Sequence, residues 1–109
     1  MEIDYKTTKL KKLCLFSKLA DKKLGPRSGV KLRSRLADIE AEPNVSALVA
    51  GRPHPYTGDK RGLFSLDLDG GNRLLFEPRE EPPTLKEDGG IDWSKVESIN
   101  IVLIGDPHE

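Results

Sequence analysis

The order of apolar and polar positions divides the chain into a helical first part and a strand-like second part. Residues 2–6 alternate apolar and polar side chains, which indicates a short first strand. Apolar residues then recur every three or four positions over about residues 8–24, a spacing that predicts one helix. A second helix is expected over about residues 26–41, because Gly25 is suited to end the first helix and Pro26 to begin the next. The side chains expected to face the core are Leu13, Phe16, Ala20 and Leu24 of the first helix and Leu32, Leu36 and Ile39 of the second.

The second part of the chain has the period of β-strands. Residues 62–69 alternate strictly, and the following Asp69-Gly70-Gly71-Asn72 is typical of a tight hairpin turn, which needs positive φ. Residues 73–77 then form the antiparallel partner. The prolines and glycines of residues 78–92 predict a loop, and residues 98–104 form an apolar last strand. Within the first of these strands we expect Leu63, Ser65, Asp67 and Asp69 on one face and Phe64, Leu66 and Leu68 on the other.

This order of elements predicts the fold class. A strand, two helices and then three or four antiparallel strands make an α+β protein whose helices pack on one face of a small antiparallel sheet. The 109 residues suffice for one domain, residues 1–109, with one modest core.

Composition indicates a globular protein of the cytoplasm. Hydrophobic residues make up 36% of the chain and charged residues 33%. No apolar run approaches the roughly 18 residues of a membrane span, and the first residues lack the apolar segment of a signal peptide. A lone cysteine, Cys14, excludes an internal disulfide, which suits a reducing compartment. Its place in an apolar helix stripe favours packing over reactivity.

The net charge of zero conceals an asymmetry. Residues 1–36 hold eleven Lys and Arg against three Asp and Glu, a balance of +8, and the remainder carries −8. This split is consistent with a basic face for an anionic partner, or simply with two helices bearing solvated lysines. Many of the acidic residues gather in residues 77–92, which indicates one acidic loop rather than a second face.

Two histidines, His54 and His108, are the candidates for acid–base chemistry. Both lie in turn-rich polar segments, and imidazole, with an ordinary pKa of about 6.5, can serve as acid or base near neutral pH. His54 precedes the strands and His108 follows the last one, so the two could reach the same end of the sheet. The chain contains no P-loop, cysteine cluster or carboxylate-rich metal motif, so we expect no metal, no cofactor and no nucleotide hydrolysis.

A set of motifs in this order resembles the HigB-type killer toxins of the RelE/ParE superfamily. The family pattern is a His-Pro, a Gly-Asp, a hairpin ending in Arg-Leu-hydrophobic-Phe, and a terminal Asp-Tyr-His. The matching segments here are Gly51-Arg52-Pro53-His54-Pro55, Gly58-Asp59, Asp69-Gly70-Gly71-Asn72-Arg73-Leu74-Leu75-Phe76 and Asp106-Pro107-His108. The resemblance covers essentially the whole chain, including the paired helices.

The resemblance implies a type II toxin that cleaves messenger RNA in the ribosome without a metal and is restrained by a helix-turn-helix, HigA-like antitoxin. It implies that His54, Asp106 and His108 are catalytic and that Arg73 lies near the scissile phosphate. Such an enzyme needs a base for the RNA 2′-hydroxyl, an acid for the leaving 5′ oxygen and a cation for the phosphate, giving a 2′,3′-cyclic phosphate. Which group is base and which is acid stays open from the sequence.

Further residues are candidates for contact with RNA or the ribosome. Thr57 stands where the family often has lysine, and Lys60 and Arg61 nearby could replace that charge. Pro107 stands where the family has tyrosine, and Tyr56 could supply an aromatic ring instead. The helix lysines Lys22 and Lys23 could contact ribosomal RNA or could simply be solvated.

Two other functions remain open at this level. Relatives of the ParE type poison DNA gyrase by binding, without cleaving RNA, and the loss of tyrosine at Pro107 is compatible with that change of target. A third alternative is an inactive interaction module that only binds a helix-turn-helix antitoxin. Arg73 has a structural alternative as well, as a cross-strand partner of Asp67 or Asp69.

Overall fold

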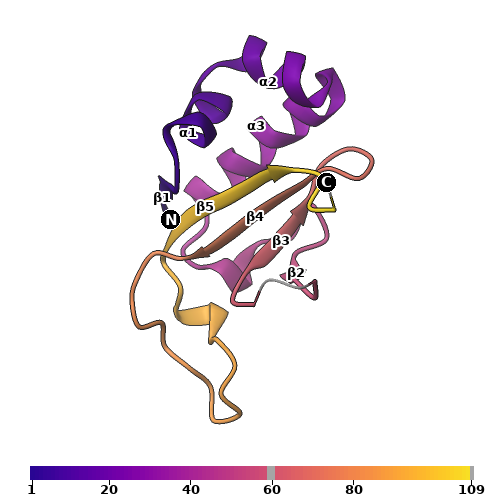
Figure 1. Ribbon diagram of the computed structural model, residues 1–109. Coiled ribbons are helices and arrows are strands. Elements are labelled where there is room, and N and C mark those ends of the chain that lie inside the picture. Colours follow the sequence, from indigo (N-terminus) through magenta and orange to yellow (C-terminus); the bar gives the residue numbers. More distant parts are fainter. Residues whose placement is uncertain (59–60, 109) are drawn as a thin grey trace.

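The protein was analysed as a computed structural model that describes residues 1–58 and 61–108. The described part has a helical layer packed against one sheet (Figure 1). Its helices are α1 (Thr8–Leu15), α2 (Ser17–Leu24) and α3 (Pro26–Ala41), with short 3-10 turns at Val45–Ala47 and Trp93–Lys95. Its strands are β1 (Glu2–Tyr5), β2 (His54–Pro55), β3 (Phe64–Asp67), β4 (Arg73–Pro78) and β5 (Ser98–Gly105).

The strands lie in the order β1-β5-β4-β3-β2. The three neighbouring pairs from β2 to β5 are antiparallel, as expected, and β4 and β5 form the longest pairing. β1 runs parallel to β5, so that the first and last strands of the chain lie side by side. The expected α+β class is confirmed, while the sheet is mixed rather than wholly antiparallel.

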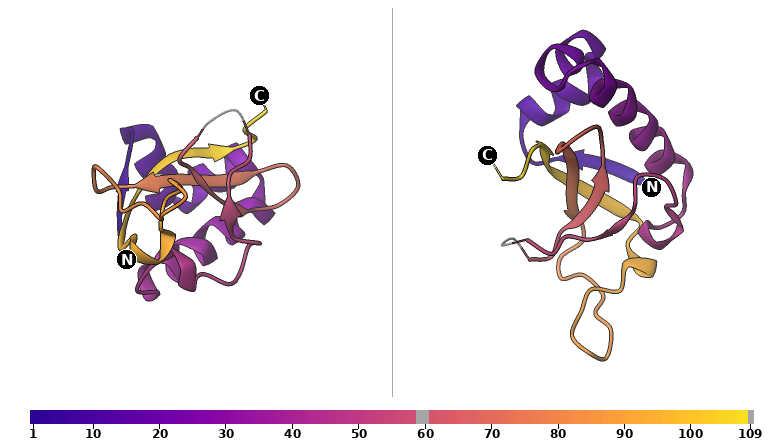
Figure 2. Two further views of the ribbon diagram at one scale, coloured as in Figure 1. Left: turned by 90° about the horizontal axis from the view of Figure 1, so that it is seen from below. Right: turned by 90° about the vertical axis from the view of Figure 1, so that its right-hand side faces the viewer.

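The core lies between α3 and one face of the sheet. Leu32 and Ile39 of α3 are fully buried and Leu36 nearly so, which confirms the predicted stripe. Phe64 and Leu66, which the alternation of residues 62–69 placed on one face, belong to the same core. The right-hand view of Figure 2 shows the helices on one side of the sheet. We call the opposite side the outer face.

The prediction of one helix over residues 8–24 was wrong. The chain leaves helical geometry at Phe16, which has φ −115° and ψ 99°, so α1 and α2 are separate. No proline or glycine marks the break. Phe16 was expected in the core, yet 57% of its surface is exposed, because the break turns its side chain outward while Ala20 of α2 is fully buried. The cause is tertiary, since α2 packs along α3 and α1 packs against β1 and β5.

Two local expectations were confirmed with shifted limits. The strand predicted over residues 62–69 is shorter, Phe64–Asp67. Pro78, the first residue of the predicted loop, still belongs to β4, and residues 79–92 have no strand beyond an isolated bridge between Leu85 and Ile91. Cys14 is half-buried, and its burial raises the pKa of the thiol to about 12, which keeps it neutral and unreactive at physiological pH. None of the described helices has the length and apolar character needed to cross a membrane.

One buried hydroxyl ties the β3–β4 hairpin to α3. Ser28, near the start of α3, is 1% exposed and donates to the Asp69 carbonyl at 3.3 Å. It accepts from the Asp69 main-chain N–H at 3.1 Å and from Nδ2 of Asn72 at 3.0 Å. This contact fixes the hairpin from which β4 begins, and β4 begins with Arg73.

We expect Ser28→Ala to lower the free energy of unfolding by about 1–3 kcal/mol, because two donors lose their acceptor in a buried place. Urea unfolding followed by the fluorescence of Trp93 measures this change. Ser34→Ala, at an exposed position of the same helix, is the matched control and should change stability by no more than about 0.5 kcal/mol. Equal stability of both variants would show that the hydroxyl does not anchor the hairpin.

Candidate functional site

The strand pairing brings the central candidate residues onto the outer face of the sheet. Residues paired across neighbouring strands direct their side chains to the same face. One row across the strands contains His54, Ser65, Leu75 and Leu103, and the next contains Asp67, Arg73 and Gly105. His54 and Arg73 therefore share the outer face, although 18 residues separate them in the sequence.

His54 lies on the short edge strand β2 and is half-buried. Its Nδ1 is 2.6 Å from the main-chain oxygen of Arg52. A carbonyl oxygen only accepts, so Nδ1 carries the proton and Nε2 of the neutral ring carries the lone pair. This tautomer makes Nε2 the atom of His54 that can take a proton from a substrate.

Arg73 is the first residue of β4 and is held by three contacts. Its Nη1 donates to the carbonyl oxygens of Gly70 and Asn72, each at 2.9 Å, and its Nε lies 3.1 Å from Oδ1 of Asp67. Its side chain is only 25% exposed. The cross-strand pairing with Asp67 expected as the structural alternative is present, and it fixes the direction of the guanidinium.

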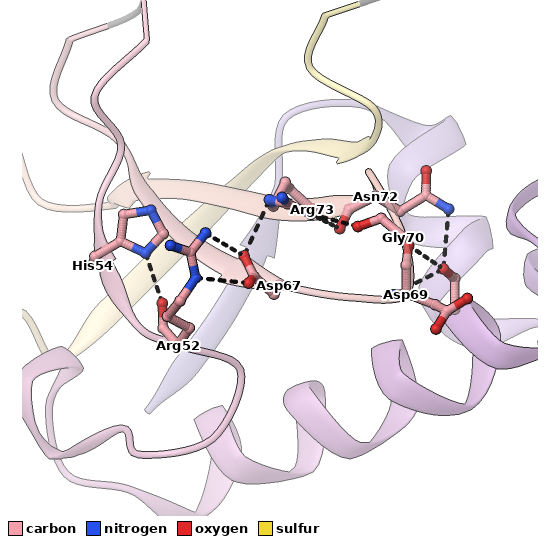
Figure 3. A network of polar contacts seen from close by, with 8 residues as sticks. Arg52, His54, Asp67, Asp69, Gly70, Asn72 and Arg73 are labelled. Carbon is pink, nitrogen blue, oxygen red and sulfur yellow. Dashed lines mark hydrogen bonds and ion pairs between the residues drawn. The ribbon is translucent and has the colours of Figure 1, made fainter.

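Arg52 and Asp67 are residues of this site to which the sequence analysis gave no role in chemistry. Nε of Arg52 lies 2.9 Å from Oδ2 of Asp67, so the carboxylate bridges two arginines, as Figure 3 shows. The hydrogen bond from Arg52 holds the pKa of Asp67 below its usual range despite partial burial, with Arg73 and His54 adding to the effect. Two features of the sequence could have pointed to these residues. Arg52 precedes His54 by two positions, and Asp67 is the residue expected opposite Arg73 in the hairpin.

Asp106 and His108 lie just past the end of β5. Oδ1 of Asp106 accepts from the main-chain N–H of His108 at 2.9 Å, and His108 is exposed. The right-hand view of Figure 2 shows the C-terminal tail extending away from the helices. The described contacts of these two residues include none with His54. The fold thus places Asp106 and His108 at the end of the sheet where β4 begins with Arg73. His54, in contrast, is linked to Arg73 by contacts that run through Arg52 and Asp67.

The residues expected to contact RNA or the ribosome are divided among three places. Tyr56 and Arg61 line a hollow of about 310 Å³ together with Trp93 and the backbone of Gly89 and Gly90. Lys60 lies outside the described residues. Lys22 is exposed on α2, and Lys23 lines a groove of about 490 Å³ between α1, α2 and the end of β5, which Asp106 also lines.

The expected contact residues therefore lie in separate parts of the structure. Tyr56 and Arg61 follow His54 along the chain and extend the outer-face site, with Trp93 held by its ring contact to Phe64 at 4.9 Å. Lys22 and Lys23 belong to the helical side. The described residues contain no group of three or more His, Cys, Asp or Glu side chains that could hold a metal ion.

The chemistry available on the outer face is that of anion binding and proton transfer. Two guanidinium groups and one carboxylate leave a net positive charge beside an imidazole with a free lone pair. Guanidinium groups bind phosphate through paired N–H donors. The arrangement is therefore suited to a phosphate-containing ligand with a hydroxyl to deprotonate.

Comparison with known proteins finds a structural likeness and no sequence family. No family model and no curated protein matches the chain. The structure matches a YoeB/ParE toxin from Agrobacterium tumefaciens with a TM-score of 0.59, covering 97% of this chain and 98% of that chain at 13% identity. The chain has the fold of that toxin over nearly its full length, which agrees with the RelE-like fold that the sequence predicted. The narrower HigB assignment stays a prediction.

Proposed function

We propose that this chain is the toxin of a type II toxin–antitoxin system and acts as a metal-free, ribosome-dependent endonuclease of messenger RNA. The observation that carries the proposal is the joined placement of His54 and Arg73 on the outer face of a toxin fold. Neither residue alone would distinguish an enzyme from a binding module. Together they provide a proton acceptor and a fixed cation, which are two of the three groups that the reaction needs.

The reaction divides among the residues as follows. Nε2 of His54 takes the proton of the RNA 2′-hydroxyl, whose oxygen attacks the adjacent phosphorus. Arg73 binds the phosphate oxygens while the bond from phosphorus to the 5′ oxygen breaks. A proton donor then protonates the leaving 5′ oxygen, giving a 2′,3′-cyclic phosphate and a 5′-hydroxyl. We assign the donor to the tail, to His108 or Asp106, because the tail follows Gly105, the residue of β5 that is paired with Arg73.

The partners follow from the same proposal. The toxin acts on messenger RNA bound to the ribosome, with Tyr56, Lys60 and Arg61 extending the contact from the active site along the RNA. A helix-turn-helix antitoxin of the HigA type restrains it. No cofactor takes part in the proposed steps, and the protein works in the cytoplasm.

The test is to map messenger RNA 5′ ends in cells after brief induction of the wild-type chain and of His108→Ala. New cleavage sites confined to translated regions, seen with wild type and strongly reduced in the variant, are the expected result. Growth arrest without new ends, accompanied by DNA-damage signalling, would overturn the proposal in favour of a ParE-like gyrase poison. If induction causes neither growth arrest nor new RNA ends, the chain is an interaction module that only binds its antitoxin.

A further inference from the structure

The backbone at Arg52 adopts a conformation that side chains rarely take. Its φ is +49°, and among the described residues no other non-glycine residue has a positive φ. Such a conformation is unfavourable for a residue with a Cβ and persists where surrounding contacts fix it, often at functional sites. The main-chain N–H of Asp67 donates to the oxygen of the preceding Gly51 at 2.7 Å, so the backbone here is bound to β3.

Arg52 contributes to the site through two different groups. Its main-chain oxygen accepts the hydrogen bond that sets the tautomer of His54. Its side chain, 68% exposed, is bound to Asp67 through Nε at 2.9 Å and Nη2 at 3.4 Å. The left-handed residue thus links the proposed base to the proposed cation site.

The donors that remain on the two arginines determine what this cluster can bind. A guanidinium has five N–H donors. On Arg73, Nε and Nη1 are engaged, and within the described chain no acceptor is recorded for Nη2. On Arg52, Nε and Nη2 contact Asp67, and within the same residues none is recorded for Nη1. Each arginine therefore keeps N–H groups for a ligand while its direction is fixed by one shared carboxylate.

We propose that Arg52 is a second phosphate-binding residue of this site and that Asp67 is a positioning residue. Asp67 holds Arg52 and Arg73 side by side, so that both bind one RNA phosphate next to His54. This inference rests on the proposed function for the identity of the ligand as RNA. Two fixed guanidinium groups bind a phosphate in one orientation, and that orientation presents the neighbouring 2′-hydroxyl to Nε2 of His54. Asp67 carries its charge at neutral pH. Its pKa is lowered, so this holding contact is complete above the ordinary carboxyl range and is lost only as the pH falls through the lowered value.

The test uses Arg52→Gly, because glycine adopts a positive φ without strain and retains the carbonyl that holds His54. The probe is a short 2′-O-methyl oligoribonucleotide, which cannot be cleaved because its attacking hydroxyl is blocked. We expect Arg52→Gly to weaken binding about 10- to 100-fold and to reduce the slope of log affinity against log salt by about 0.7. Arg52→Lys should restore the slope without the full affinity, since a lysine keeps the charge but not the planar fork.

Asp67→Asn separates positioning from binding. The variant loses a negative charge beside the ligand, so oligonucleotide affinity should stay the same or rise. Cleavage of messenger RNA on ribosomes should fall about 10- to 100-fold, because the guanidinium groups are no longer held in place. A fall in affinity in step with cleavage would overturn the positioning role.

The controls distinguish this inference from its premise. Arg79, which follows the far end of β4, is also in an ion pair, with Glu2 of β1. Arg79→Ala should leave affinity nearly unchanged. Imidazole ¹⁵N shifts should show the same His54 tautomer in Arg52→Gly as in wild type. Failure of the wild type to bind the oligonucleotide, or equal affinity and salt slope in Arg52→Gly, overturns the inference. Arg52-dependent binding by a wild type that creates no RNA ends would overturn the nuclease function and leave the phosphate site standing.

Discussion

His54→Ala is expected to lower ribosome-dependent cleavage of messenger RNA by about 10²- to 10⁴-fold, the usual contribution of a positioned acid–base residue. The reason is that Nε2 of His54 is the proton acceptor left free by the hydrogen bond from Nδ1 to Arg52. Primer extension on a messenger RNA that is being translated in a cell extract measures the cleavage rate directly. The same variant should lose growth inhibition in cells.

The fold should survive this substitution. His54 sits on a two-residue edge strand, is half-buried and has no place in the core formed with α3. Thermal unfolding of the variant should therefore resemble that of wild type. Glu87→Ala, an exposed change in the loop 78–92, is the activity control and should cleave normally. Undiminished cleavage by a folded His54→Ala protein would remove His54 from the mechanism.

Phe76→Ala is expected to have the largest effect on stability, about 3–5 kcal/mol. Phe76 lies in the central strand β4, has no exposed surface and packs against Phe64 with ring centroids 5.6 Å apart. A domain of this size has a total stability of roughly 5–15 kcal/mol, so the variant should be close to unfolding at 37 °C. Urea unfolding followed by Trp93 fluorescence gives the value, because Trp93 also contacts Phe64, with ring centroids 4.9 Å apart.

The matched control for this loss is Val49→Ala. Val49 is 86% exposed, so trimming it removes almost no buried surface and should change stability by no more than about 0.5 kcal/mol. A Phe76→Ala protein as stable as wild type would mean that the packing between α3 and the sheet does not limit stability.

The elements that the sequence predicted are those governed by local physical rules. The alternation of residues 62–69 placed Phe64 and Leu66 on one face, because successive side chains of a strand point to opposite faces. That face is the one that packs into the core. The glycines of the Asp69–Asn72 turn predicted the hairpin through their tolerance of positive φ, which Gly70 adopts. The start of α3 at Pro26 follows from the fixed φ of proline.

The candidate site could be predicted only in part. His54 was found because the chain has only two imidazole groups, and Arg73 because the hairpin motif that contains it resembles the pattern of the toxin family. Arg52 and Asp67 were not, since an arginine and an aspartate on a surface usually make weak ion pairs. The place of Arg52 and Asp67 in the site depends on the pairing of β3 with β4 and on the left-handed backbone at Arg52. Neither feature can be predicted from the residue types alone.

The sequence by itself determined the α+β class, the buried face of α3, the alternation of residues 62–69 and the hairpin, because each depends on near neighbours in the chain. It also offered His54 as a candidate for acid–base chemistry. The tertiary structure alone decided three matters: the break at Phe16, the parallel pairing of β1 with β5, and the joining of His54 to Arg73 through Asp67. These depend on contacts between segments far apart in the sequence. These contacts are stabilised by burial and by charge interactions in the folded protein, and a local sequence pattern does not reveal them.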